Sequence, residues 1–184
     1  AELTTTTHTG FHQYTFPESS DAHIILDMNH GIYNYDGKVL WSYIRVENDT
    51  LVTGYRITSG WARTSYLYFA MVFSKPFKSY GGKNDEQLVY NGFWRKFDQE
   101  HNFPEIAGKK LKAYFDFETG NCEKIKVRLA ISAVSTEGAL KNLQTEIPHS
   151  DFEKVRKEAK AAWQKELEKI VIDASSEKKV TFYT

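Results

Sequence analysis

Two carboxylates, Asp116 and Glu118, have the types and spacing that could support acid–base chemistry. Such catalysis commonly uses one carboxyl group as the proton donor and another as the proton acceptor. However, these residues alternate with Ala113, Phe115 and Phe117, and a period of two is typical of a strand with one apolar face. We therefore interpret the pair as the solvated surface of a strand, and we assign no catalytic residue.

The six histidines lie at positions 8, 12, 23, 30, 101 and 149 and form no pattern typical of a metal site. None belongs to a His-x-x-x-His helix motif or stands beside a cysteine, so we assign no metal ligand. His8 and His12 are predicted to lie on different strands, which favours hydrogen bonding at strand ends over metal binding. The sequence also lacks a Gly-x-Ser-x-Gly elbow and a phosphate-binding loop.

Aromatic residues make up 15% of the chain, and this content has two explanations. The first is packing, because aromatic and β-branched side chains fill sheets. The second is contact with a flat ligand such as a sugar ring. Trp61, which follows the flexible Gly60, and Trp94 are the substrate-binding candidates that we single out.

The composition restricts the class of protein. The 184 residues allow one fair-sized domain with appendages. Lysine and arginine number 24, as do aspartate and glutamate, so no basic surface for nucleic acid is predicted. No apolar run approaches the roughly 20 residues that a membrane span requires. Cys122 is the single cysteine, which excludes an intrachain disulfide and leaves the cellular compartment open.

Alternating patterns predict strands in the first part of the chain. Residues 2–17 predict two strands joined at Gly10, because β-branched threonines precede a glycine that permits a reversal. A half-buried strand is predicted at 23–30, an extended segment at 41–46 and a hairpin at 47–57.

The middle of the chain contains the most apolar segment. The run Tyr66–Ser74 predicts a central strand that is covered on both faces. Residues 78–108 predict a loop-rich section in which 88–90 and 93–97 could each form a short strand.

The clearest amphipathic strand follows. Its inward residues are predicted to be Ile125, Val127, Leu129 and Ile131, which alternate with charged or small residues. Together these strands predict a mainly β fold, an antiparallel two-sheet β-sandwich over residues 1–134.

The period then changes from two to about 3.6, which predicts helices over residues 135–184. Ser135 caps a short helix that Pro148 stops, and Ser150 with Glu153 predicts a capping box for a long helix. To be buried, the apolar stripe of that helix must dock against the sandwich or against a neighbouring chain. The stripe consists of Phe152, Val155, Ala159, Trp163, Leu167 and Ile170.

Two separated groups of motifs resemble one known family. Glu-Leu-Thr-x-Thr and Gly-Phe-His-x-Tyr-Thr-Phe-Pro stand near the amino terminus. Thr-Gly-Tyr-Arg-x-x-x-Gly-Trp-Ala follows at 53–62, and Tyr-Phe-Ala-x-x-Phe-Ser-Lys-Pro-Phe at 68–77. These motifs resemble the N-terminal β-sandwich domain, of the supersandwich type, of the bacterial exo-α-1,2-mannosidases of glycoside hydrolase family ninety-two. Family members more often have arginine where this chain has His8 and Gln13.

The resemblance implies a longer protein. Residues 135–184 would form a helical linker leading towards a missing catalytic helical-barrel domain. The catalytic acid, the base and a calcium ion would belong to that domain, so none is carried over to this chain. The implied partners are a mannose-containing glycan and the protein's own C-terminal catalytic domain. The implied location is extracytoplasmic, in the bacterial periplasm or secreted. Because the chain starts inside a strand pattern, we expect it to begin within a longer sequence.

Three functional hypotheses follow. The favoured one is the non-catalytic N-terminal domain of an α-1,2-mannosidase, which packs on the catalytic barrel and helps to wall its pocket. This fragment alone would then be inactive. The second is a free-standing carbohydrate-binding sandwich, which explains Trp61 and Trp94 but not the long amphipathic helix. The third is a purely structural or interaction domain, which the motifs disfavour. Mannoside binding by the isolated chain would separate the second hypothesis from the first.

Overall fold

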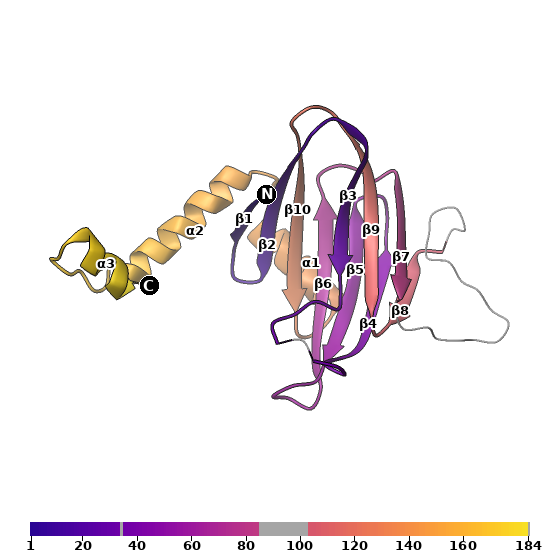
Figure 1. Cartoon of the computed structure of the whole chain (residues 1–184), viewed down its shortest axis with the longest axis horizontal. Helices are drawn as coiled ribbons and strands as arrows, with labels where there is room; N and C mark the ends of the chain where they lie inside the picture. Colours follow the sequence, from indigo (N-terminus) through magenta and orange to yellow (C-terminus); the bar gives the residue numbers. More distant parts are fainter. Residues whose placement is uncertain (34, 85–102, 184) are drawn as a thin grey trace.

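The computed structural model describes residues 1–33, 35–84 and 103–183 and shows two antiparallel sheets followed by helices (Figure 1). The larger sheet has seven strands in the order β1-β2-β10-β6-β5-β4-β8, and the smaller has three in the order β3-β9-β7. All the described strand pairs are antiparallel, so the predicted fold class is confirmed. The strands are β1 (Glu2–Thr5), β2 (Thr9–Phe16), β3 (Ser19–Asp27), β4 (Val39–Val46), β5 (Leu51–Thr58), β6 (Ser65–Phe73), β7 (Ser79–Asn84), β8 (Glu105–Gly108), β9 (Leu111–Thr119) and β10 (Glu123–Ser132).

The main core lies between the two sheets. Strand β9 supplies Phe115 and Phe117, both 0% exposed, and strand β10 supplies Ile125, which is also 0% exposed. The rings of Phe73 and Phe77 pack on Phe115 with centroids 5.1 Å apart in each case. The predicted alternation in β9 and β10 is confirmed, and Leu129 and Ile131 join the same core as partly buried residues. Packing therefore explains much of the aromatic content.

Gly54 in β5 allows neighbouring strands of the larger sheet to approach closely. A Cβ atom at Gly54 would lie 2.1 Å from the carbonyl oxygen of Tyr43 and 2.7 Å from the ring of Phe69. Strands β4 and β6 therefore approach β5 at a point where no side chain fits. On the opposite face of the sheet the rings of Tyr43 and Tyr55 stack with centroids 5.4 Å apart. This stacking joins neighbouring strands directly.

The first hairpin turns at a different place from the one predicted. Strand β1 ends at Thr5 and β2 begins at Thr9, so the reversal lies at residues 6–8. Gly10 lies inside β2, opposite Thr5 on one side and Leu129 on the other. The prediction of a turn at Gly10 was wrong because the turn uses threonine: the hydroxyl groups of Thr5 and Thr6 donate to the carbonyl of Thr9.

Strand β6 is central in position but is covered along only part of its length. It lies between β10 and β5, as predicted. Residues Phe69–Phe73 are mostly buried, whereas Tyr66 and Leu67 are 47% and 43% exposed. Coverage on both faces is therefore confirmed for the second half only. The strands suggested at 88–90 and 93–97 lie outside the described residues, and β7 is a strand within a section predicted to be loop-rich.

Helix α1 (Thr136–Glu146) covers the outer face of the larger sheet, where it contacts β10 and β6 (Figure 1). Ser135 caps it as predicted, because its hydroxyl accepts a hydrogen bond from the backbone N–H of Gly138. The side chain of Asn142 donates to the carbonyl of Ile131 over 2.9 Å and fixes the helix to β10.

Helix α2 (Phe152–Leu167) begins at a different cap from the one predicted. The carboxylate of Asp151, not the hydroxyl of Ser150, accepts from the backbone N–H of Lys154. Asp151 therefore replaces the predicted capping box, and Glu153 pairs instead with Arg156 at 2.5 Å.

The apolar stripe of α2 docks only at its start. Phe152 and Val155 are each 1% exposed and pack with Phe11 and Ile147, whereas Trp163 is 68% exposed. Of the two predicted docking surfaces, the sandwich therefore receives only the start of the stripe, because α2 leaves the sheet beyond its first turns (Figure 1). Docking of the remaining residues on a neighbouring chain stays a prediction. Helix α3 (Ser176–Tyr183) follows at the end of this tail.

Candidate functional site

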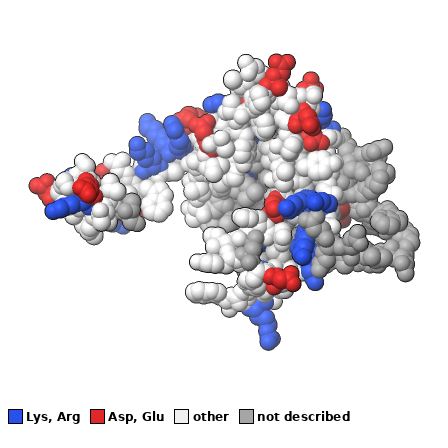
Figure 2. All heavy atoms as spheres, in the orientation of Figure 1, with Lys and Arg blue, Asp and Glu red and all other residues white. Residues whose placement is uncertain are grey.

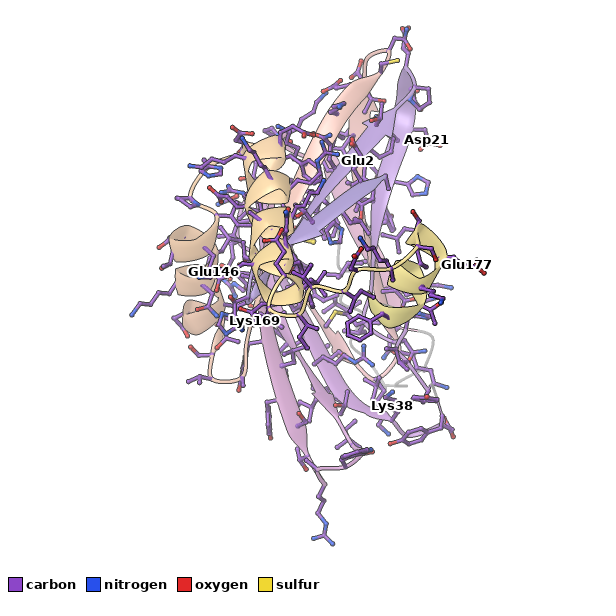
Figure 3. All side chains as sticks on the ribbon, turned by 90° about the vertical axis from the view of Figure 1, so that its left-hand side faces the viewer. Glu2, Asp21, Lys38, Glu146, Lys169 and Glu177 are labelled. Carbon is purple, nitrogen blue, oxygen red and sulfur yellow. The ribbon has the colours of Figure 1, made fainter. Side chains whose placement is uncertain are left out.

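Two loops meet at one end of the sandwich. The first, residues 28–38, joins β3 to β4, and the second, residues 59–64, joins β5 to β6. The Tyr35 hydroxyl donates to the Ser59 carbonyl over 2.9 Å, and the Ser59 N–H donates to the Lys38 carbonyl over 2.9 Å. Figure 3 labels Lys38 at this end, with Asp21 at the opposite end. We call the two loops together the loop-end surface.

Trp61 lies at the tip of the second loop. Its exposure of 110% means that no described part of the chain packs against it. The loop is held by a hydrogen bond from the Gly60 N–H to the Ala62 carbonyl at 3.0 Å. An indole with both faces free can stack on a ligand or insert into another domain.

Arg56 and Asp27 anchor the first loop to the strands. Asp27 accepts hydrogen bonds from the backbone N–H groups of Asn29 and His30 at 2.8 and 3.0 Å. Burial acts to raise the pKa of Asp27, but these two bonds and Lys112 outweigh it and hold the pKa below its ordinary value. A guanidinium N–H of Arg56 donates to the carbonyl of His30 over 2.7 Å. Burial lowers the pKa of Arg56, an effect that the nearby Asp27 opposes.

Lys38 organises the tip of the first loop. Its ammonium group donates to the carbonyls of Ile32 and Tyr33 and lies 5.9 Å from the ring centre of Tyr35. Tyr33 has a φ of 54°, in the left-handed region that a tyrosine seldom adopts. Its side chain is 88% exposed, so the strain brings no burial. Backbone strain of this kind is concentrated at functional sites.

A hollow of about 400 Å³ opens beside the first loop. It is lined by Asn29, Tyr35, Asp36, Gly37, Lys38, Val39, Lys109 and Lys110. A second hollow, of about 300 Å³, lies along α2 between Ala161 and Lys169 and contains no aromatic side chain. The first is therefore the better candidate for a ligand, because it combines an aromatic ring with several polar groups.

The acid–base candidates are confirmed as part of a strand surface. Asp116 accepts a hydrogen bond from the hydroxyl of Ser79 over 2.7 Å, and Glu118 is exposed on the same face of β9. Neither residue faces the core, and neither belongs to the loop-end surface. The geometry offers them no shared site in which acid–base chemistry could occur.

The paired histidines also have structural partners. Nδ1 of His8, in the turn between β1 and β2, lies 2.6 Å from a carboxylate oxygen of Glu146 at the end of α1. Nδ1 of His12 lies 2.8 Å from the hydroxyl of Tyr14. Burial lowers the pKa of His12 and raises that of Tyr14, which favours the neutral forms. Within the described residues, no cluster of three or more potential metal ligands was found.

The structure describes only one of the two tryptophans that were predicted to contact a ligand. Trp61 lies on the loop-end surface, whereas Trp94 lies outside the described residues. Sequence reasoning missed Tyr35 and Lys38, because it interpreted their segment only as turn chemistry. An aromatic residue between two turn formers was the available signal.

In the face shown in Figure 2, basic and acidic side chains lie scattered among uncharged ones. Among the described residues, no helix combines the length and apolar character that crossing a membrane requires.

Fold and site together define a β-sandwich domain with an exposed aromatic loop surface at one end and a helical tail. Residues 1–132 match the family described as the glycosyl hydrolase family 92 N-terminal domain. Residues 138–184 match the glycosyl hydrolase family 92 catalytic domain. The chain therefore belongs to glycoside hydrolase family 92 and contains its N-terminal domain with a short start of its catalytic domain.

Solved structures agree with this assignment. A family GH92 α-mannosidase from Bacteroides thetaiotaomicron superimposes with a TM-score of 0.84 and 35% identity, covering 99% of this chain and 23% of that protein. The GH92 family glycosyl hydrolase ccman5 has a TM-score of 0.76 at 22% identity, covering 95% and 21% of the respective chains.

An inverting GH92 mannosidase from Bacteroides thetaiotaomicron VPI-5482 has a TM-score of 0.74 at 26% identity, with coverage of 95% and 21%. The chain thus spans less than a quarter of the length of these structural relatives. A comparison with curated proteins gives no match.

Proposed function

We propose that this chain is the non-catalytic N-terminal part of an exo-α-1,2-mannosidase that hydrolyses terminal α-mannosides of glycans. The observation that supports the proposal is the succession of two family matches, the N-terminal domain over residues 1–132 and the catalytic domain from residue 138. Residues 135–184 would then lead from the sandwich into the catalytic barrel.

The chemistry of the reaction would come from residues beyond this chain. Glycoside hydrolysis uses two carboxyl groups held roughly 5–10 Å apart across the bond, one of them with a raised pKa. In the described part of the chain, Glu2, Asp27, Glu123, Glu137 and Glu146 all have lowered pKa values. A lowered pKa suits a permanent anion rather than a general acid. Calcium is likewise expected in the catalytic domain, as the resemblance to family 92 implies.

The tail would supply one contact between the two parts of the protein. Trp163, Ile170 and Val171 are 68%, 60% and 79% exposed, although apolar surface of this kind is normally covered. Because residues 138–184 match the catalytic domain, we assign this surface to the packing of α2 and α3 on the remainder of that domain.

The loop-end surface would contribute to the wall of the sugar pocket. Trp61 has a fully exposed indole on a loop that three hydrogen bonds hold in place. They run from the Tyr35 hydroxyl to the Ser59 carbonyl, from the Ser59 N–H to the Lys38 carbonyl and from the Gly60 N–H to the Ala62 carbonyl. An aromatic ring held in this way can stack on the apolar face of a sugar. The glycan would be met outside the cytoplasm, in the bacterial periplasm or after secretion, because large glycans do not cross a membrane unaided.

Hydrolysis of defined substrates tests this function. The 184-residue chain and a version extended through the complete catalytic domain are incubated with α-1,2-mannobiose and calcium, and released mannose is measured. We expect turnover by the extended protein and none by the 184-residue chain. Parallel reactions with α-1,3- and α-1,6-mannobiose test the linkage. Turnover by the short chain would show that the active site is misplaced, and failure of the extended protein on all three substrates would contradict the proposal.

A carbohydrate-binding sandwich without catalytic partner is the second candidate, and the exposure of Trp61 favours it. Titration of the 184-residue chain with mannobiose, followed by indole fluorescence, separates the two. Binding at micromolar concentration that Trp61→Ala abolishes would favour the binding module. Absence of binding by the isolated chain, together with an increase in KM when Trp61→Ala is placed in the extended protein, would favour the mannosidase domain.

A further inference from the structure

The hollow beside the loop-end surface has the composition of a sugar-binding site. Tyr35 is 52% exposed and lines it, so an aromatic ring is available to a ligand. Asn29 and Asp36 also line the hollow, and their side chains carry an amide and a carboxylate group. Such groups donate and accept the hydrogen bonds that sugar hydroxyls form. The volume of about 400 Å³ lies within the range of small-molecule sites.

The hollow is lined by charged groups of both signs, which suits a ligand that both donates and accepts hydrogen bonds. Lys38, Lys109 and Lys110 line it, which at first suggests an anion site. However, the ammonium group of Lys38 is engaged by the carbonyls of Ile32 and Tyr33. The carboxylate of Asp36 lies on the same lining and would repel an anion. Hydroxyl groups can accept a hydrogen bond from an ammonium group and donate one to Asp36, so a polyol matches both signs of charge on the lining.

The hollow and Trp61 belong to one connected structure. Tyr35 lines the hollow and donates its hydroxyl hydrogen bond to Ser59, two residues before Trp61. The hydroxyl of Ser59 in turn donates to the Gly37 carbonyl over 3.2 Å, and Gly37 also lines the hollow. A ligand that contacts Trp61 can therefore extend along Tyr35 into the hollow without leaving the loop-end surface.

We propose that the hollow is a distal subsite that binds the sugars on the reducing side of a neutral oligomannoside, beyond the residue that is cleaved. The proposal rests on the proposed mannosidase function. It adds a determinant of chain-length preference, with Asn29 and Asp36 as the hydrogen-bonding residues and Tyr35 as the aromatic wall. The subsite contributes binding energy far from the bond that breaks, so its loss should change KM and leave kcat unchanged.

The test compares substrates of two lengths in the protein extended through its catalytic domain. Asp36→Asn and Asn29→Ala are measured with α-1,2-mannobiose and with α-1,2-mannotetraose. We expect each substitution to raise the KM for mannotetraose about tenfold, the effect of one lost hydrogen bond to a charged or well-placed group. The KM for mannobiose and both kcat values should stay as in the unsubstituted protein. Asp21→Asn, at the opposite end of the sandwich, is the matched control and should change nothing.

Each outcome decides the proposal. Equal changes for both substrates, or no change for either, would overturn the distal subsite while leaving the mannosidase function intact. If the extended protein hydrolyses no mannoside, the proposed function fails. Titration of the 184-residue chain with mannotetraose then tests whether the hollow binds an oligomannoside. Binding that Asp36→Asn weakens but Asp21→Asn does not would support the subsite, and absence of binding would contradict it. Thermal unfolding of every variant checks that these exposed substitutions leave the fold unchanged.

Discussion

The two halves of α2 contain the same kinds of residue in very different surroundings. At its start the ring of Phe152 packs edge-on against Phe11, with centroids 5.3 Å apart, and is 1% exposed. Further along the same stripe, Trp163 and Leu167 are 68% and 44% exposed. The sequence period is continuous across both halves, so periodicity alone does not reveal where the partner surface ends.

This difference distinguishes a completed domain from an incomplete one. The core of the sandwich and the first turns of α2 consist of large side chains that are buried within the chain. The rest of α2 presents a face that needs a partner, and the catalytic-domain match from residue 138 identifies what that partner is expected to be. Variants at matched positions in the core, at the start of α2 and in its second half test this distinction.

The core substitution Phe115→Ala should have the largest effect. Phe115 is 0% exposed and contacts the rings of Phe73 and Phe77. We expect the free energy of unfolding to fall by about 3–5 kcal/mol, because the burial of the ring is lost and a cavity is left behind. Urea unfolding followed by circular dichroism measures it. A loss below about 1 kcal/mol would contradict the assignment of Phe115 to the core.

Phe152→Ala should come next. We expect the free energy of unfolding to fall by about 3 kcal/mol or slightly less. The site lies near the edge of the sheet, so its neighbours can relax into the space that the ring leaves. The exchange of backbone amide hydrogens in α2 should accelerate, while that in β9 should not change. Protection that falls equally in both elements would show that α2 and the sandwich unfold as one unit.

Glu146→Gln should produce a smaller effect that depends on pH. Burial acts to raise the pKa of Glu146, but hydrogen bonds from Thr6 and His8 outweigh it and lower the pKa. The native state therefore binds the proton less readily than the unfolded chain does. The resulting stability is present above the ordinary carboxyl pKa and is lost as pH falls through the lowered value.

We expect Glu146→Gln to cost about 1–2 kcal/mol at pH 7 and much less at low pH, because the carboxylate accepts charge-assisted hydrogen bonds from the β1–β2 turn. Urea unfolding at several pH values provides the measurement. Asp27 keeps its own lowered pKa, so part of the acid sensitivity should persist in the variant. A cost that stays constant between pH 7 and pH 3 would disprove the role of the charged form.

Trp163→Ala should have the smallest effect in this chain. The side chain is mostly exposed, so we expect a change within about 0.5 kcal/mol. In the protein extended through its catalytic domain the same substitution should cost about 3 kcal/mol or more, because the indole would then be buried. Equal, small effects in both proteins would refute the docking of α2 on the remainder of the catalytic domain.

Much of the sandwich could be predicted from the sequence, since each strand with one buried face shows its period directly. Strands β7 and β8 were exceptions, because both lie in the section predicted to be loop-rich, and the sequence of β7 contains the pair Gly81-Gly82. A Cβ atom at Gly81 would lie 2.2 Å from the hydroxyl of Tyr114, so the glycine gives room to a ring on the neighbouring strand. The paired residues Gly81 and Tyr114 are far apart in sequence, and only the folded sheet shows why glycine is suitable there.

The candidate site was less predictable for the same physical reason. Trp61 could be selected because it follows a flexible glycine. The contribution of Tyr35 depends on a hydrogen bond to Ser59, which belongs to a different loop. The role of Lys38 depends on the unusual backbone of Tyr33. Neither contact produces a periodic pattern in the sequence. The turn at residues 6–8 and the cap at Asp151 were missed because several adjacent polar residues could each have served.

The position of β10 between β2 and β6 has a consequence for how the protein is made. Strand β2 pairs on one side with β10, which ends at Ser132, so this neighbour is synthesised long after β2 itself. Pairings between such distant segments form slowly, because a long loop must close before any contact forms. Until then the edges of β2 and β6 are open to other chains. We expect the nascent domain to depend on chaperones or slow translation up to β10, and to become protease-resistant only once this strand has emerged.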